Sequence, residues 1–227
     1  MIIYLTRHGQ PALENMPKGA DYELPDGDYV LTPQGRQQAT CLGNFLKKKN
    51  FRGKIFSSPY ARTLETASIV ASICGVKIDP APRIQEIRRD TPEPPCPGMT
   101  LEELRKNYPE VAPDATLVEP WMIQIPGESR EDIHKRVHPF LEEIIANPPA
   151  DEVLLVGHGA SIGATRYFMQ QRSQYDGPQG YNWNCSLNTF ESFTDGRIIT
   201  HELHNIEFMP LEIVTSNMRV YGDPECV

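Results

Sequence analysis

Three short apolar runs stand out in the pattern of hydrophobic and polar positions along the chain. They cover residues 2–5, 54–56 and 153–156, and each is bounded by polar or small residues. A continuous apolar run of this length is typical of a strand buried on both faces of a sheet. Each run is followed by a segment with apolar residues at helical spacing, so strands and helices are expected to alternate.

Four longer segments show helical periodicity and carry signals for their ends. One is expected to begin after Thr32, with a proline in its first turn, and another after Pro59. A third begins at about Ser129 and ends before Pro148, and a fourth follows Gly159. Their apolar stripes would cover the faces of the sheet.

The last regular pattern predicts a β-hairpin. Residues 187–193 and 197–203 flank the turn sequence Thr194-Asp195-Gly196. Added to the alternating strands and helices, it predicts an α/β fold. We expect a three-layer α/β/α sandwich whose sheet is mainly parallel with an antiparallel member.

Residues 88–126 interrupt this alternation and are rich in proline. Within them, Thr100 and Glu103 have the spacing of a capping box at the start of one short helix. Either the stretch is a surface loop without a function or it is a lid, and long loops in compact domains are usually functional. We interpret it as a small lid insertion in a single domain spanning residues 1–227. Residues 205–227 would form a C-terminal tail that covers the core or makes a dimer contact.

The overall charge and composition exclude several classes of partner. The formal net charge is -8 and the sequence pI is about 5.3, so no global basic field exists to attract nucleic acid or anionic lipid. No apolar run approaches the ~18 residues that span a bilayer. The chain starts without a basic leader, and its five cysteines are scattered, which fits a reducing compartment. We therefore expect a cytoplasmic protein with neither nucleic-acid nor membrane partners.

Chemically active residues follow each of the three apolar strands. Arg7 and His8 come after the first strand, Arg62 comes after the second at the start of a helix, and His158 comes after the third. Ligands of open α/β sheets bind outside the carboxyl ends of the strands. Two arginines and two histidines are therefore expected around one pocket.

These residue types suit a phosphate group. The planar guanidinium donates two hydrogen bonds to two oxygen atoms, and a histidine with a pKa of ~6.5 is a neutral nucleophile at neutral pH. Each residue alone could be an ordinary polar side chain at a strand end. The combination at three separate strand ends favours a phosphate site.

Four segments in order carry a resemblance to a known family. They are Arg7-His8-Gly9, residues 31–39 (LTPQGRQQA), residues 57–67 (SSPYARTLETA) and residues 156–159 (VGHG). On these motifs the chain resembles the histidine phosphatase superfamily, also called phosphoglycerate-mutase-like proteins, from Ile2 to about Leu203.

The resemblance implies a mechanism that uses neither metal nor cofactor. His8 would attack phosphorus and become phosphohistidine, while Arg7, Arg62 and His158 bind the phosphoryl oxygens. Glu86, in Ile84-Gln85-Glu86, occupies the place of the family's general acid. His8, His158 and Glu86 could in principle ligate a metal instead, but we expect no metal site.

Two departures from the family pattern leave alternatives open. Pro11 and Glu14 stand where the family often has Ser or Thr and Asn, so Gln10 or Asn15 would supply the extra phosphate contact.

The second departure follows Glu86, where the family's glycine and aromatic residues are missing. Asp90 or Glu93 could be the acid instead. Arg88 and Arg89 could recognise a second anionic group or be a solvated basic pair.

The expected function is hydrolysis of a phosphomonoester, with a small phosphorylated metabolite as substrate and a homodimer as a possible assembly. No match is found to the insert of the glycolytic mutases, which favours a phosphatase. The alternatives are a phosphoglycerate-type mutase and a non-catalytic phosphate-binding protein of the same fold.

Overall fold

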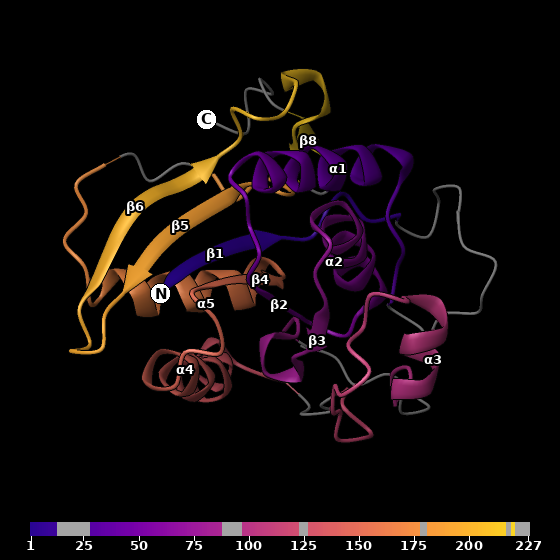
Figure 1. The fold of residues 1–227 in the computed structure, drawn as a ribbon, viewed down its shortest axis with the longest axis horizontal. Helices are drawn as coiled ribbons and strands as arrows, with labels where there is room; N and C mark the ends of the chain where they lie inside the picture. The colour runs from indigo at the N-terminus through magenta and orange to yellow at the C-terminus, as the bar shows by residue number, and fades with distance from the viewer. Residues whose placement is uncertain (13–27, 88–96, 123–126, 178–180, 217–218, 221–227) are drawn as a thin grey trace.

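A six-stranded sheet forms the centre of the protein, in the order β3-β2-β4-β1-β5-β6 (Figure 1). The computed structural model describes residues 1–12, 28–87, 97–122, 127–177, 181–216 and 219–220. The strands of the sheet are β1 (Ile2–Arg7), β2 (Lys54–Ser57), β3 (Ile78–Pro80), β4 (Glu152–Gly157), β5 (Leu187–Ser192) and β6 (Ile198–Asn205).

Strand directions agree with the sequence prediction. β3, β2, β4 and β1 run parallel, whereas β5 pairs antiparallel with both β1 and β6. Among the six strands described in this sheet, β5 alone therefore runs against the rest. The mainly parallel sheet with an antiparallel member is confirmed. The three-residue β3 was not predicted, because so short a segment has no readable period.

Helices cover both faces of the sheet (Figure 1). α1 (Pro33–Lys48) and α2 (Ala61–Cys74) pack on one face, and α4 (Arg130–Ala146) and α5 (Gly159–Gln170) on the other. Alternate residues of β1 divide between these layers: Tyr4 belongs to the core under α1 and α2, whereas Ile3 and Leu5 belong to the core under α4 and α5. The predicted three-layer sandwich is confirmed.

The predicted helix starts are formed by side-chain caps. The hydroxyl of Thr32 accepts a hydrogen bond from the Gly35 amide at 3.0 Å, and Ser129 forms a capping box with Asp132. α2 ends at Gly75, whose φ of 73° lies in the left-handed region that glycine tolerates.

Residues 97–122, within the predicted lid, pack against the sheet end near α2. They contain α3 (Leu101–Asn107), which begins with the predicted capping box of Thr100 and Glu103. Trp121 is buried with its ring edge-on to Tyr60, at a centroid distance of 5.2 Å. The remaining elements are η1 (Pro82–Ile84), η2 (Leu211–Ile213), β7 (Thr215–Ser216) and β8 (Arg219–Val220). Whether the segment moves as a lid stays a prediction.

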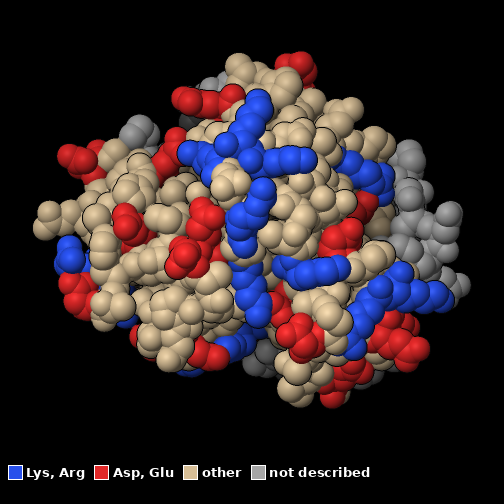
Figure 2. All heavy atoms as spheres, in the orientation of Figure 1, with Lys and Arg blue, Asp and Glu red and all other residues tan. Residues whose placement is uncertain are grey.

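The surface combines a negative net charge with local positive regions. Figure 2 shows lysine and arginine side chains forming a band across the middle of one face, with acidic side chains on both sides. The net charge of -8 is thus unevenly distributed. Among the described residues, no helix is long and apolar enough to cross a membrane.

Candidate active site

The ends of β1, β4 and β2 meet, as the sequence predicts. Arg7 pairs with Gly157 and Ser57 with Val156 in the parallel register. Beyond the strands, the His8 amide donates to the Gly157 carbonyl at 3.0 Å, and the Ser58 amide donates to the Val156 carbonyl at 3.0 Å. These backbone bonds bring the three motif segments to one edge of the sheet.

His8 is buried and held as a neutral base. Its Nδ1 lies 2.7 Å from the Gly9 carbonyl oxygen, which can only accept, so Nδ1 carries the proton and Nε2 carries the lone pair. Burial, followed by the charges of Arg62 and Arg7, holds the pKa of His8 well below its usual range. The side-chain amide of Asn184 donates to the His8 carbonyl at 2.9 Å. His8 therefore presents a nucleophilic nitrogen at neutral pH.

A close approach between two glycines fixes the loop after His8. A Cβ atom on Gly9 would lie 2.6 Å from the Gly35 carbonyl oxygen, and one on Gly35 would lie 2.3 Å from the Gln10 carbonyl oxygen. Neither position has room for a side chain. The Gly9 amide also donates to the Thr66 hydroxyl at 3.0 Å, so the loop is joined to both α1 and α2.

Arg7 is buried and is oriented by neutral oxygen atoms. Its Nη1 donates to the Ser216 hydroxyl at 2.9 Å and to the Asn182 carbonyl at 3.2 Å. Burial lowers the pKa of Arg7, and the charge of Glu86 opposes this effect. Sequence reasoning missed Ser216, Asn182 and Asn184, which come from the last part of the chain.

Arg62 lies in the first turn of α2, as predicted. Asp28 accepts hydrogen bonds from the Ala61 amide through both carboxylate oxygens, at 2.8 and 3.0 Å, and lies 3.7 Å from Arg62 Nη1. The guanidinium also lies over the Tyr60 ring, 4.7 Å from its centroid. Asp28 thus caps the helix and orients the arginine, a role that its sequence context did not indicate.

His158 faces His8 across the site. Their ring centroids are 5.3 Å apart, and His158 Nε2 lies 2.8 Å from the Ser58 hydroxyl. Its buried Nδ1 has no hydrogen-bond partner among the described residues. Burial, then the charges of Arg62, His8 and Arg7, hold the pKa of His158 well below its usual range. His158 is therefore also neutral, with Nε2 hydrogen-bonded to Ser58.

Glu86 joins the site from the segment after η1. Its Oε1 accepts from the Ala160 amide at 3.1 Å and from the Ile87 amide at 3.0 Å, so its carboxylate caps the first turn of α5. Its charge also acts on Arg7. The other proposed acids and basic residues, Asp90, Glu93, Arg88 and Arg89, lie outside the described residues.

The predicted extra phosphate contacts remain predictions. Gln10 is buried beside the site, and its side-chain carbonyl accepts from the Thr32 hydroxyl at 2.8 Å. Asn15 lies outside the described residues.

One histidine pair was overlooked in the sequence. His134 and His138 lie four residues apart on α4, a spacing that suits two metal ligands, and their ring centroids are 4.7 Å apart. Among the described residues, no group of three or more potential ligand side chains occurs. The expectation that no metal takes part in the reaction still awaits a test.

Comparison with known proteins identifies the family. The model of the histidine phosphatase superfamily (branch 1) matches residues 3–205. The chain belongs to this superfamily. A probable phosphoglycerate mutase, GpmB of Yersinia pestis, is 30% identical over 164 residues, which are 71% of each chain. The resemblance drawn from the four sequence motifs is confirmed.

Several solved structures share the fold, among them proteins named as phosphatases. Bacillus stearothermophilus YhfR matches with a TM-score of 0.62 at 23% identity, covering 91% of this chain and 98% of that one. A mycobacterial glucosyl-3-phosphoglycerate phosphatase with inorganic phosphate matches with a TM-score of 0.59 at 20% identity, covering 92% and 99%. The superfamily contains phosphatases and mutases, and membership supports an enzyme.

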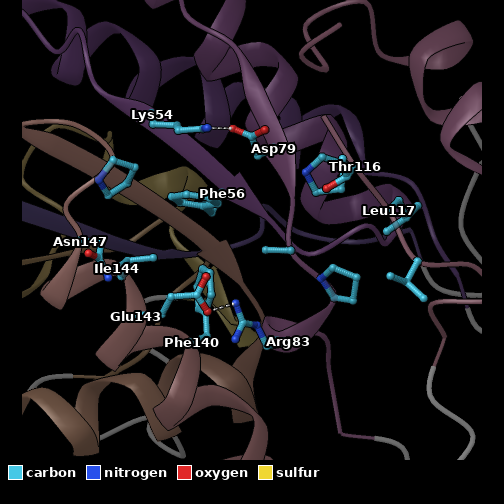
Figure 3. A pocket seen from close by; sticks show the side chains of 15 residues that line it. Lys54, Phe56, Asp79, Arg83, Thr116, Leu117, Phe140, Glu143, Ile144 and Asn147 are labelled. Carbon is cyan, nitrogen blue, oxygen red and sulfur yellow. Dashed lines mark hydrogen bonds and ion pairs between the residues drawn. The ribbon is translucent and has the colours of Figure 1, made fainter. Parts of the chain in front are cut away.

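Two hollows of the surface differ in their relation to these residues. A groove of about 940 Å³ between α4 and α5 reaches Gly159, Ala160 and Ile87, the neighbours of Glu86. A pocket of about 600 Å³ lies at the β3 edge of the sheet and contains none of the predicted site residues (Figure 3). The groove, rather than the pocket, adjoins the candidate active site.

Proposed function

We propose that this protein hydrolyses the phosphomonoester of a small metabolite through a phosphohistidine at His8. The observation that carries the proposal is the state of His8: it is buried and neutral, its Nδ1 proton is engaged by Gly9, and its Nε2 lone pair is available. Such a nitrogen can attack phosphorus without a preceding proton transfer.

In the first step, Nε2 of His8 forms a bond to phosphorus while the bond to the ester oxygen breaks. Arg7, Arg62 and His158 bind the three remaining oxygens and stabilise the charge that spreads over them. Glu86, in its protonated carboxylic acid form, gives its proton to the departing oxygen and becomes a carboxylate. Its carboxyl group is positioned for this role by the amides of Ile87 and Ala160.

In the second step, Glu86 takes a proton from a water molecule, which attacks the phosphoryl group. The bond between phosphorus and Nε2 breaks, inorganic phosphate leaves, and His8 is neutral again. The protons transferred in the cycle move from Glu86 to the leaving oxygen and from water to Glu86, and Arg7 and Arg62 supply the positive charge, so the proposed mechanism uses no metal.

Replacement of the nucleophile tests this proposal. With excess chelator present, we expect His8→Ala to lower phosphate release from phosphorylated metabolites by at least about 10⁴-fold. The wild type should form an acid-labile, base-stable phosphoenzyme that His8→Ala lacks. His201→Ala is the matched control, since His201 is exposed and pairs with Glu191 on β5. Full activity of His8→Ala would contradict the mechanism. Loss of wild-type activity on adding chelator would contradict its independence of metal.

A phosphoglycerate mutase is the second candidate, because GpmB, the relative at 30% identity, is named as a probable one. Products distinguish the two reactions. Incubation with phosphoglycerate gives free phosphate if the protein is a phosphatase and the positional isomer, without phosphate, if it is a mutase. A non-catalytic binding protein would give neither product and no phosphoenzyme.

A further inference from the structure

The groove between α4 and α5 begins at the candidate general acid. Gly159 and Ala160 line its near end, and a Cβ atom on Gly159 would lie 3.8 Å from Oε2 of Glu86. A general acid must contact the leaving oxygen, so the leaving group must lie on its side of the phosphate. A Cβ atom on Gly163, one turn further along α5, would meet nothing within 4 Å. The groove is therefore open along the outer face of α5.

Arg166 lines this groove, and no acidic side chain among the described residues pairs with it. It is half-buried, and burial lowers its pKa. Its Nη1 is hydrogen-bonded to Nε2 of His204, and among the described residues no carboxylate forms an ion pair with it. Removing an arginine from water without an anionic partner is costly. Its charge would be compensated by an anion bound in the groove.

His204 holds Arg166 in this position. Burial, then the charge of Arg166, lowers the pKa of His204 to about 4, so the ring is neutral and Nε2 accepts from the arginine. The backbone of His204 has a φ of 56°, a conformation that residues other than glycine rarely adopt. Its amide donates to the side chain of Asn188, which in turn donates to the Leu5 carbonyl. Arg166 is thus anchored to the central sheet.

A second arginine lines the same groove from α4. Arg130 is exposed, and among the residues that the structure describes none pairs with its side chain. The one acidic side chain in the lining, Glu131, already lies 3.7 Å from Nζ of Lys135. The groove therefore carries a net positive charge beside an active site that accepts a phosphate.

We propose that the groove binds a second anionic group of the substrate, carried on the leaving group and held by Arg166 together with Arg130. This inference rests on the proposed phosphatase function. Arg166 follows Gly159 by about two turns, which is ~10 Å along the helix axis. An extended chain covers ~3.3–3.6 Å in three backbone bonds. The substrate class is accordingly an elongated phosphomonoester whose far end is a carboxylate or a second phosphate, longer than a three-carbon phosphoacid.

A matched set of synthetic esters tests the proposal. Octanoate phosphorylated on a terminal hydroxyl is compared with the corresponding octanamide, and the propanoate and propanamide esters form a short pair. For the wild type, kcat/KM should favour octanoate over octanamide by about tenfold or more, since a hydrogen bond to a charged group contributes that much. The short pair should show a ratio near one.

Variants of the two arginines test whether these residues cause the preference for octanoate over octanamide. Arg166→Gln and Arg130→Gln should each reduce the octanoate-to-octanamide ratio, and the double variant should bring it to about one. His204→Leu should also reduce the ratio, whereas His204→Gln, which keeps an acceptor, should restore part of it. Arg83→Gln is the control, because Arg83 lies in the other pocket and is paired with Glu143. A wild-type ratio near one, or a full ratio in the double variant, would overturn the proposal.

Binding separates this inference from the proposed function. If phosphate is released from all four esters without preference, only the anion site fails. If no phosphate is released from any of the esters, the phosphatase proposal fails. The anion site is then tested by calorimetry, which measures the affinity of each ester. The octanoate ester must then bind about tenfold more tightly than the octanamide ester, and equal affinities would refute the site.

Discussion

The pocket at the β3 edge and the catalytic end of the sheet differ in how closely carboxylates approach their basic residues. In the pocket, Lys54 pairs with Asp79 at 2.8 Å and Arg83 with Glu143 at 2.7 Å, and Figure 3 shows both pairs at its walls. At the catalytic end, Arg7 donates to a hydroxyl and a carbonyl, and Arg62 lies 3.7 Å from its carboxylate partner.

The difference indicates which hollow is prepared for an anion. Close ion pairs in the pocket already neutralise the cations, so a phosphate entering it would have to displace a carboxylate. At the catalytic end the Asp28 carboxylate lies 3.7 Å from Arg62 Nη1, beyond hydrogen-bonding distance, so this arginine keeps part of its positive field for a ligand. The distance between the cations and their carboxylate partners therefore distinguishes the two regions.

The largest expected contrast is between two arginine replacements. Arg62→Lys should lower kcat/KM for a phosphomonoester by about 10²–10³-fold, because a compact ammonium cannot replace the two-pronged guanidinium. Arg83→Lys in the pocket should change kcat/KM by less than about twofold. Steady-state kinetics of both variants measure the contrast, and equal effects would remove the basis of the comparison.

Glu86 should show an effect that depends on the leaving group. We expect Glu86→Gln to slow alkyl phosphates by about 10²-fold and activated aryl phosphates far less, because only a poor leaving group needs a proton. Glu143→Gln, at the pocket, is the matched control. If aryl and alkyl phosphates suffer equally, a different residue is the acid.

Stability should fall with acidification because buried histidines, two of them at the catalytic end and one at His204, have depressed pKa values. The pKa values of His8 and His158 are depressed in the folded state, so below the unfolded value of ~6.5 the unfolded chain binds more protons. Stability is then fully present above pH ~6.5. Below it, each such histidine removes up to ~1.4 kcal/mol per pH unit. Chemical denaturation at pH 7 and pH 5.5 measures the slope.

The slope should become shallower in His8→Asn, which lacks one of the histidines with a depressed pKa. The pocket lining contains no histidine among the described residues, so Arg83→Gln should leave the slope unchanged. An equal free energy of unfolding at both pH values in the wild type would contradict the depressed pKa values.

The smallest effect is expected in the pocket itself. Arg83 and Glu143 are exposed, with side-chain accessibilities of 43% and 62%, so their ion pair is screened by water. A double-mutant cycle with Arg83→Gln and Glu143→Gln should give a coupling energy of ~0.2–1 kcal/mol in unfolding experiments. A coupling of several kcal/mol would mean that the pocket is a stabilising centre.

Local patterns predicted the sheet, its helices and the meeting of three strand ends. Apolar runs predict the strands, and capping residues such as Thr32 predict where helices start. Parallel strands bring Arg7, Arg62 and His158 to one edge of the sheet. These features depend on neighbours in sequence or on the rule that parallel strands end together.

The partners of these residues could not be predicted in the same way. Asp28, Asn184 and Ser216 contact the site from segments far away in the chain, and small polar residues in such segments have no distinguishing period. The φ of 56° at His204 is likewise a product of tertiary packing. Long-range contacts of this kind become visible only when the fold is known.

The hydrogen bond between Arg7 and Ser216 also determines when the site can form during synthesis of the chain. Ser216 follows Arg7 by 209 residues. At a synthesis rate of ~5–20 residues per second, the arginine waits about 10–40 s on the ribosome for its partner. For most of this interval the first strand also lacks β4 or β5, which flank it in the finished sheet and end at Gly157 and Ser192. The candidate site can therefore be completed only well after His8 has been made, because Arg7 waits for a partner that follows it by 209 residues.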